Sequence, residues 1–389
     1  MPSNRSSAHI VRNVRGCIRL HRRRRLSGRA GGAPQLAHKR TPSPAGLAMV
    51  RGACRNRTDG RAHRLRIQSL LLIIESPMNA ANRSCAETLR VYGNLSLLEM
   101  APVLLAAEQI HAGKTLLSHG SVMALWGKAS DLASLKSAGQ ADIALNSETQ
   151  ALRGSADHPD LRFIFTVAEC PYRIVARRSA GIVRLADLRG KRVGTQLESS
   201  AEFFLDAMLR SVGLTADDVV RVPFMAHTQA PIKLLPQALR DGQIDAVALW
   251  EPQVQNAKMA IGADAIAFYD PAVYTEKFCL CTTQANLDDP VMRPKIVAFV
   301  RSLIAATRRL KIEPEIGWRL VAQAAELDVE TVRSAWPYFD YVGRLATDLL
   351  DVFVRQEPWI ARTQNRSPRT REALAALIDD SVVREAQAG

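Results

Sequence analysis

The stretch Leu185–Arg210 most constrains the fold, because a strand, a short loop and an amphipathic helix follow one another there. We expect the strand over Arg192–Gln196 and the helix from about Ser199. Ser199 and Glu202 have the S-x-x-E spacing of a capping box, in which each side chain accepts a hydrogen bond from an N–H of the first turn. Such a loop presents free N–H groups and the positive end of a helix dipole to a ligand. Taken alone, it also fits an ordinary βα turn.

A second copy of this local design lies earlier in the chain. An apolar strand ends at Asn146–Gln150, in which Ser147 and Gln150 again have capping-box spacing. In addition, residues 138–145 and 240–249 share the pattern G-Q-x-D followed by an apolar strand. The repetition indicates two related halves, and ligands of open α/β sheets bind at the carboxyl ends of such strands.

Predicted strands alternate with helices from residue 88 to about 289, which implies parallel βαβ units with helices on both sheet faces. Within this part we expect 121–126 to be extended or bent and 131–137 to form a short helix. The remainder is almost wholly helical, and we expect it to pack around the first unit. Its predicted helices are 291–311, 315–326, 329–336, 345–361 and 368–384.

The net charge of +14 belongs almost entirely to residues 1–78, where only Asp59 and Glu75 are acidic. This composition, rich in Arg, Gly, Ser and Pro, predicts a disordered basic extension over 1–87, outside the fold. The part of the chain beyond it is close to neutral. The basicity therefore does not indicate a nucleic-acid-binding domain.

Three interpretations of the extension stay open. It could be a nucleic-acid-binding arm, although it contains no aromatic residue through position 78. It could hold an export signal around the apolar run Ile67–Ile74, which is short for that role. Alternatively the start is assigned too early, and Met49 or Met78 is the first residue.

Cysteine spacing and catalytic motifs give no indication of an enzyme. The six cysteines are scattered without the spacing of a zinc site, and most are expected to be buried small hydrophobes. We find no paired catalytic carboxylates, nucleophile elbow or phosphate-binding P-loop in the sequence. We therefore expect no catalytic residue, no metal site and no cofactor.

In combination and in this order, four stretches resemble the periplasmic substrate-binding proteins of ABC importers. The resemblance is to the branch that takes nitrate, taurine, aliphatic sulfonates and thiamine precursors, and it extends over about Leu89–Arg355. The four stretches are 187–194, 201–205, 213–219 and 242–252.

The resemblance implies an α/β fold of the type 2 periplasmic-binding-protein kind. Such a fold has two lobes of mixed sheets flanked by helices, a ligand cleft between the lobes, and here a helical C-terminus. Lobe 1 would comprise 88–173 with 270–389, and lobe 2 would comprise 174–269. The implied mechanism is hinge closure, in which the ligand stabilises the closed state by its differential affinity.

Residues carried over from the resemblance would line the cleft at three strand ends and near the hinge. Tyr92 and Trp250 fit ordinary core packing equally well, and the loop residue His227 is a further candidate. The carried-over residues are Tyr92, Asn94, Asn146, Ser147, Glu148, Gln196, Glu198, Ser199, Ser200, Trp250 and Glu251.

Two acids distinguish this chain from an anion-binding pattern. Glu148 and Glu198 stand beside the capping hydroxyls, where a carboxylate would repel a sulfonate or nitrate. Either these acids point away and serve the helix dipoles, or the ligand carries an amine or a heteroaromatic ring. We favour the second interpretation, a small polar organic molecule with pyrimidine-like or amino character.

The leading hypothesis is a non-catalytic, monomeric solute receptor that delivers its ligand to an ABC permease and ATPase and binds no nucleic acid. Its expected place is the periplasm, or the cytoplasm if Met78 is the true start. One alternative is an enzyme like the thiamine-pyrimidine synthases, to whose cysteine-rich motif Cys279-Leu-Cys281 is a poor match. The other is the effector-sensing domain of a regulator, although the extension lacks the two periodic helices of a helix-turn-helix.

Overall fold

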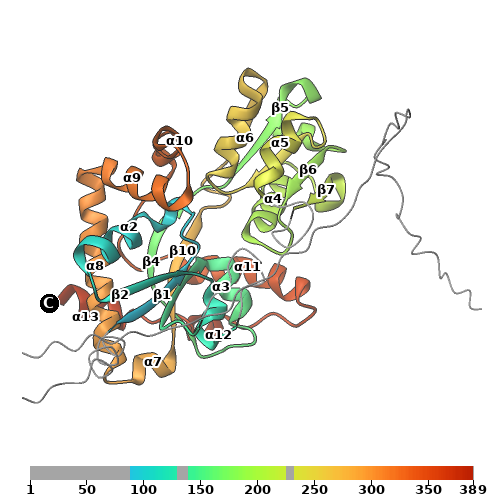
Figure 1. Cartoon of the computed structure of the whole chain (residues 1–389). Helices are drawn as coiled ribbons and strands as arrows, with labels where there is room; N and C mark the ends of the chain where they lie inside the picture. The colour runs from blue at the N-terminus through green and yellow to red at the C-terminus, as the bar shows by residue number, and fades with distance from the viewer. Residues whose placement is uncertain (1–87, 129–138, 225–231, 389) are drawn as a thin grey trace, which may run out of the picture. The chain divides into compact units, whose positions relative to one another are not determined.

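Two mixed β-sheets organise this chain (Figure 1). The computed structural model describes residues 88–128, 139–224 and 232–388. The first sheet has the order β2 (Thr115–His119), β1 (Leu89–Gly93), β3 (Ile143–Ser147), β10 (Glu276–Thr283), β4 (Leu161–Cys170). The second has the order β7 (Val220–Pro223), β6 (Arg192–Thr195), β8 (Ala246–Leu249), β5 (Arg173–Arg177), β9 (Ala265–Phe268). We call the parts built on them lobe 1 and lobe 2.

Each sheet combines three parallel strands with two antiparallel pairings. Strand β1 runs parallel to β2 and β3, and β10 then runs antiparallel to β3 and β4. In lobe 2, β6 runs parallel to β7 and β8, whereas β5 runs antiparallel to β8 and β9. The chain passes from lobe 1 to lobe 2 between β4 and β5 and returns between β9 and β10. This arrangement confirms the predicted two-lobed α/β fold with mixed sheets. The exact lobe ranges stay a prediction.

Helices flank both sheets at nearly all the expected places. The segment after β1 is continuously helical, formed by η1 (Leu98–Met100), α2 (Ala101–Leu105) and η2 (Ala106–Ile110). The longer helices between strands are α3 (Glu148–Gly154), α4 (Ser200–Ser211), α5 (Leu235–Arg240) and α6 (Gln253–Ile261), and α7 (Gln284–Asp288) follows the last strand, β10. The other short turns are η4 (Arg178–Ala180), η5 (Leu185–Leu188), η6 (Ala216–Asp218), η7 (Ile232–Leu234), η8 (Gly262–Asp264) and η9 (Trp336–Tyr338).

The expectation of an extended or bent run over 121–126 is wrong, because Val122–Trp126 forms the 3₁₀ helix η3. The Ser121 side chain caps its first turn by accepting a hydrogen bond from the backbone of Met123 at 3.3 Å. Gly127, in the left-handed conformation with φ of 66°, ends it. Local capping of the backbone thus outweighs the strand preference of the sequence.

The C-terminal helices pack largely on lobe 1, as expected (Figure 1). The predicted single helix over 368–384 is wrong. There the backbone pairs with the edge strand β4 instead, since Phe163 N–H donates to Leu377 O at 2.8 Å and Asp379 N–H donates to Phe163 O at 3.0 Å. These bonds satisfy an otherwise open sheet edge. The helices are α8 (Met292–Ile312), α9 (Pro314–Ala325), α10 (Val329–Ala335), α11 (Leu349–Thr363), α12 (Arg371–Ala375) and α13 (Ser381–Ala388).

Strand β10 shows why lobe 1 needs helices on both faces. All of its residues are buried. Cys279 and Cys281 face one apolar cluster, whereas Phe278 and Leu280 face the other, as the two-residue period of a strand requires. Both cysteines are thus buried small hydrophobes, as expected.

Some predictions fall outside the described residues, namely the disordered extension 1–87, the short helix 131–137 and the loop residue His227. In the part of the chain that the structure describes, no helix is both long and apolar enough to span a lipid bilayer.

Candidate functional site

A cavity of about 290 Å³ lies where loops of both lobes meet. The predicted loops after β1, β3 and β6 all reach it, and so does the residue that follows β8. This is the carboxyl end of parallel strands, where open α/β sheets bind ligands. The predicted residues that line the cavity are Asn94, Asn146, Ser147, Gln196, Glu198, Ser199, Ser200 and Trp250.

The lobe 1 loop is held by capping hydrogen bonds. Asn146 Oδ1 accepts from the backbone N–H of Val122 at 3.0 Å, which ties the end of β3 to η3. Ser147 Oγ accepts from the backbone N–H of Gln150 at 3.4 Å and caps α3, as the sequence predicted. These bonds fix the side chains that the loop presents to the cavity.

In the lobe 2 loop, both capping hydrogen bonds come from backbone N–H groups one position before the predicted ones. Ser199 Oγ accepts from the backbone N–H of Ala201 at 3.1 Å and donates to Gln196 O at 2.7 Å. The Glu202 carboxylate, however, accepts from the backbone N–H of Glu198 at 2.6 Å rather than from that of Ser199. Glu198 occupies the left-handed region with φ of 56°, a conformation that is strained for a residue other than glycine.

Gln196 presents an unused polar atom. Its side chain is buried in the cavity wall, and its Oε1 receives no hydrogen bond from any described residue. Buried polar atoms are almost always paired. The amide oxygen of Gln196 is therefore an unsatisfied acceptor in the cavity wall.

Tyr92, Glu148 and Glu251 do not line the cavity. Tyr92 packs in the core, so close beneath Gly120 that a Cβ added there would lie 2.7 Å from its ring. Glu251 is buried in an ion pair with Arg173, whose Nε donates to Glu251 Oε1 at 2.8 Å. We withdraw these three residues as candidate ligand contacts.

Glu148 turns inward from the start of α3. Its carboxyl group accepts hydrogen bonds from Tyr274 Oη at 2.9 Å, the backbone N–H of Lys277 at 2.9 Å and Gln356 Nε2 at 2.5 Å. Burial raises the pKa of Glu148 above its usual range. The three donors come from segments far along the chain, so the sequence around Glu148 could not reveal this orientation.

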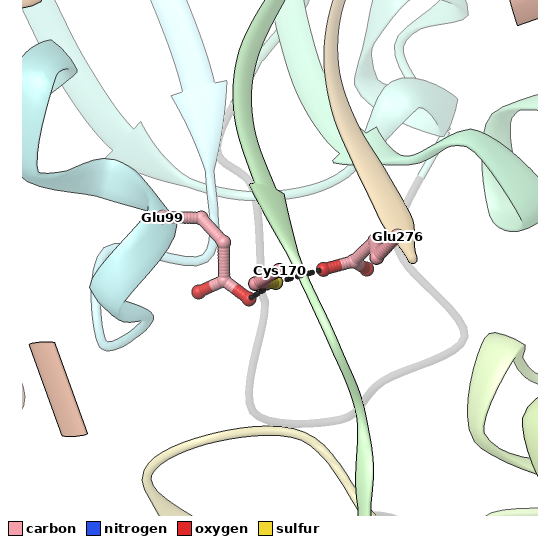
Figure 2. A group of neighbouring side chains, drawn as sticks. All are labelled: Glu99, Cys170 and Glu276. Atoms are coloured by element: carbon pink, nitrogen blue, oxygen red, sulfur yellow. Dashed lines mark hydrogen bonds between the residues drawn. The ribbon is translucent and has the colours of Figure 1, made fainter. Parts of the chain in front are cut away.

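Two buried acids that sequence reasoning missed do line the cavity, Glu99 from η1 and Glu276 from the start of β10 (Figure 2). Cys170, at the end of β4, lies between them, and its thiol can donate its one proton either to Glu276 Oε2 at 3.2 Å or to Glu99 Oε1 at 3.6 Å. Tyr172 Oη donates to Glu276 Oε1 at 2.6 Å and lies 2.8 Å from Ser200 Oγ. We call Glu99 and Glu276 the acid pair.

Burial dominates the electrostatics of the acid pair. It raises the pKa of Glu99 to about 7. It also holds the pKa of Glu276 well above its usual range, and the neighbouring Glu99 carboxylate adds to that effect. Glu99 Oε2 has no hydrogen-bond partner among the described residues. Near neutral pH the pair therefore retains protons and still offers acceptor oxygens to the cavity.

The thiol and the acid pair also have metal-ligand character, since their donor atoms all lie within 4.8 Å of one another. All three groups are buried, however, and burial holds the pKa of the Cys170 thiol well above its usual range. A metal ion needs the thiolate, so its binding would have to displace that proton as well. The arrangement is better suited to accepting hydrogen bonds from a ligand.

Two lobes of mixed sheets, with strand-end loops around a shared cavity, define a type 2 periplasmic-binding-protein fold. Residues 126–315 match the family described as NMT1/THI5 like, which confirms the resemblance found in the sequence. A Haemophilus influenzae protein whose name refers to thiamine biosynthesis is 27% identical over 206 residues. That match covers 52% of this chain and 63% of the relative, less than two thirds of its length.

Solved structures show the same fold at low sequence identity. The alkanesulfonate-binding protein SsuA of Xanthomonas axonopodis pv. citri, bound to MOPS, has a TM-score of 0.58 and 17% identity, covering 76% of this chain and 99% of that protein. The desulfurization enzyme DSZB has a TM-score of 0.50 and 14% identity, covering 78% and 99%. The fold is therefore shared by a binding protein and an enzyme, and function must be argued from the site.

Proposed function

We propose that this chain is the solute-binding component of an ABC importer. Its ligand would be a small polar organic molecule, captured by closure of the two lobes and passed to a permease and ATPase. The proposal is supported by the fold and by a cavity whose walls come from both lobes. A ligand that contacts both walls stabilises the closed state by its differential affinity. On this proposal the protein acts as a monomer in the periplasm.

The acid pair carries the proposal for the chemical class of ligand. Arg153 is the one basic side chain among the described residues that line the cavity, and it is paired with Glu198. An anion would therefore meet two buried carboxyl groups without a free cation to balance its charge. A ligand with N–H donors instead satisfies Glu99 Oε2 and Gln196 Oε1. We propose an amino-bearing or pyrimidine-like ligand in preference to nitrate or a simple sulfonate.

Calorimetric titration of the full chain with nitrate, methanesulfonate, taurine and a 4-aminopyrimidine tests this class. We expect measurable binding of the aminopyrimidine and at least tenfold weaker binding of nitrate and methanesulfonate. Glu99→Gln should weaken aminopyrimidine binding, whereas the partly exposed control Glu313→Gln, outside the cavity, should leave it unchanged. Tight binding of nitrate or methanesulfonate without a response to the amine would refute the ligand class.

An enzyme of the thiamine-pyrimidine synthase kind is the second candidate, favoured by the family match and by the name of the Haemophilus influenzae relative. Two observations count against it. Cys279 and Cys281 are buried in the core and do not line the cavity, and no histidine occurs among its described lining residues. The cavity walls instead offer capping hydroxyls, amides and protonated acids, which suit binding better than nucleophilic chemistry.

A further inference from the structure

A second cavity, of about 360 Å³, lies where α4 meets α11 and the segment 273–275. Its apolar wall is aromatic, formed by Phe203, Tyr274 and Trp359. The ring of Phe203 stands edge-on to the other two, with centroids 5.7 Å from Tyr274 and 5.5 Å from Trp359. None of these rings lines the first cavity. The wall therefore offers aromatic faces and edges to a separate ligand.

Three arginines also line this cavity, Arg210 from α4 and Arg355 and Arg362 from α11. All three are exposed, and none makes a side-chain hydrogen bond or an ion pair with a described residue. No acidic residue occurs among the described lining residues. Among the described residues, the cavity wall thus has three positive charges and no carboxylate. Guanidinium groups match carboxylate and phosphate oxygens in bidentate geometry.

Gln356 supplies a buried acceptor in the same cavity wall. Its side chain is 1% exposed, its Nε2 donates to Glu148, and its Oε1 receives no hydrogen bond from any described residue. An unpaired buried oxygen is costly, so a ligand that donates a hydrogen bond there gains more than it would at the surface. The cavity therefore combines an aromatic wall, a cluster of cations and one free acceptor.

We propose that this cavity binds a small aromatic anion that carries a hydroxyl or amino donor. Its anionic group pairs with the arginines, its ring packs against Tyr274 and Trp359, and its donor reaches Gln356. Helix α4 packs on strand β8 of lobe 2, whereas α11 packs on α3 of lobe 1. A ligand that contacts both helices favours the arrangement in which they meet, so its occupancy is coupled to binding in the first cavity.

Calorimetric titration of the full chain with 4-hydroxybenzoate tests the proposal. Benzoate, which lacks the donor, and phenol, which lacks the anionic group, serve as comparison probes. We expect saturable one-site binding of 4-hydroxybenzoate, with weaker binding of both comparison probes. The double variant Arg355→Gln/Arg362→Gln should weaken 4-hydroxybenzoate binding at least tenfold. Matched controls are Arg319→Gln, an exposed arginine on α9 away from both cavities, and Gln196→Ala in the first cavity.

Two results would overturn the proposal. One is the absence of saturable 4-hydroxybenzoate binding, or phenol binding as tight as that of 4-hydroxybenzoate. The other is binding that survives the double arginine variant but is lost in Gln196→Ala, since the probe would then occupy the first cavity. Aminopyrimidine binding is measured in the absence of 4-hydroxybenzoate, so the proposed function stands or falls separately.

Discussion

Arg153 Nη2 donates a hydrogen bond to Glu198 Oε2 at 3.0 Å, joining helix α3 of lobe 1 to the loop before α4 of lobe 2. Gln150 Nε2 adds a second link to the backbone oxygen of Glu198 at 3.0 Å. Glu198 therefore lies at the cavity rim with its charge balanced, and Glu148 is turned into the core. The repulsion of anions that the sequence suggested for these two acids is therefore not exerted by either of them.

Replacing Arg153 by Gln should loosen the closed arrangement of the lobes. The Glu198 side chain is 65% exposed, so solvent screens the pair and its contribution is about 1 kcal/mol or less. We expect a loss of ligand affinity of about fivefold at most. The free energy of unfolding should fall by about 1 kcal/mol, because Arg153 Nη1 also donates to Thr363 Oγ1 at 2.6 Å. Calorimetry with the aminopyrimidine measures the first and urea unfolding the second.

Arg333→Gln is the matched control, because it breaks an exposed ion pair with Glu330 within α10, away from both cavities. Its ligand affinity should equal that of the unsubstituted protein. If Arg153→Gln lost no more ligand affinity than this control, the link across the lobes would not contribute to closure.

Glu99→Gln should change how stability depends on pH. The pKa of Glu99 is about 7 in the folded protein, against an ordinary value of 4.5. Between these pH values the folded state keeps a proton that the unfolded state has lost, so stability falls as pH rises from 4.5 to 7. Titration of this one group lowers the free energy of unfolding by roughly 3 kcal/mol, and the decrease levels off above pH 7.

Urea unfolding at several pH values between 4.5 and 8 measures this effect. Glu276 and Glu148, whose pKa values are also raised, add falls of the same sign. The informative quantity is therefore the difference between the two proteins. The free energy of unfolding of Glu99→Gln, relative to that of the unsubstituted protein, should be greater at pH 7.5 than at pH 4.5. Parallel profiles would show that Glu99 titrates as an ordinary carboxyl group.

Local pattern accounts for what the sequence could predict. The strand ends at Asn146 and Gln196, and the caps at Ser147 and Ser199, depend on residues within about four positions of each other. These short-range rules placed both loops correctly. They also predicted a helix over 368–384 that long-range pairing of Leu377 with strand β4 interrupts.

Such short-range rules could not predict the acid pair. Glu99 sits in an ordinary apolar helical segment and Glu276 opens an ordinary strand, so neither has a local pattern that marks it. They meet at Cys170 because β10 pairs with β4, which places Glu276 opposite Cys170, and because η1, which holds Glu99, packs on β4. That register follows from sheet topology, and only the structure supplies it.

Arg173→Met should destabilise the protein strongly. The Arg173 side chain is fully buried at the start of β5, where it pairs with Glu251, donates to Gln255 Oε1 at 3.0 Å and lies 4.1 Å from the ring centroid of Tyr338. Removing one member of a buried pair leaves the other charge uncompensated, at a cost of about 3–5 kcal/mol. Urea unfolding measures this loss.

The double variant Arg173→Met/Glu251→Leu should recover much of the lost stability, because it leaves no uncompensated charge. Arg177→Gln serves as the control, since its pair with Asp264 is partly exposed and should contribute under about 1 kcal/mol. If the single variant Arg173→Met lost no more stability than this control, the buried pair would not have the structural importance assigned to it.

Ser199→Ala tests the loop that precedes α4, because the Ser199 hydroxyl both accepts from Ala201 N–H and donates to Gln196 O. Loss of an N-cap hydroxyl costs about 1 kcal/mol of stability. The bond to the backbone at Gln196 also fixes the orientation of this cavity wall, so ligand affinity should fall as well. Ser199→Thr, which keeps the hydroxyl, should restore most of both quantities. Urea unfolding and calorimetry distinguish the two effects, and an unchanged affinity in Ser199→Ala would separate the cap from the binding site.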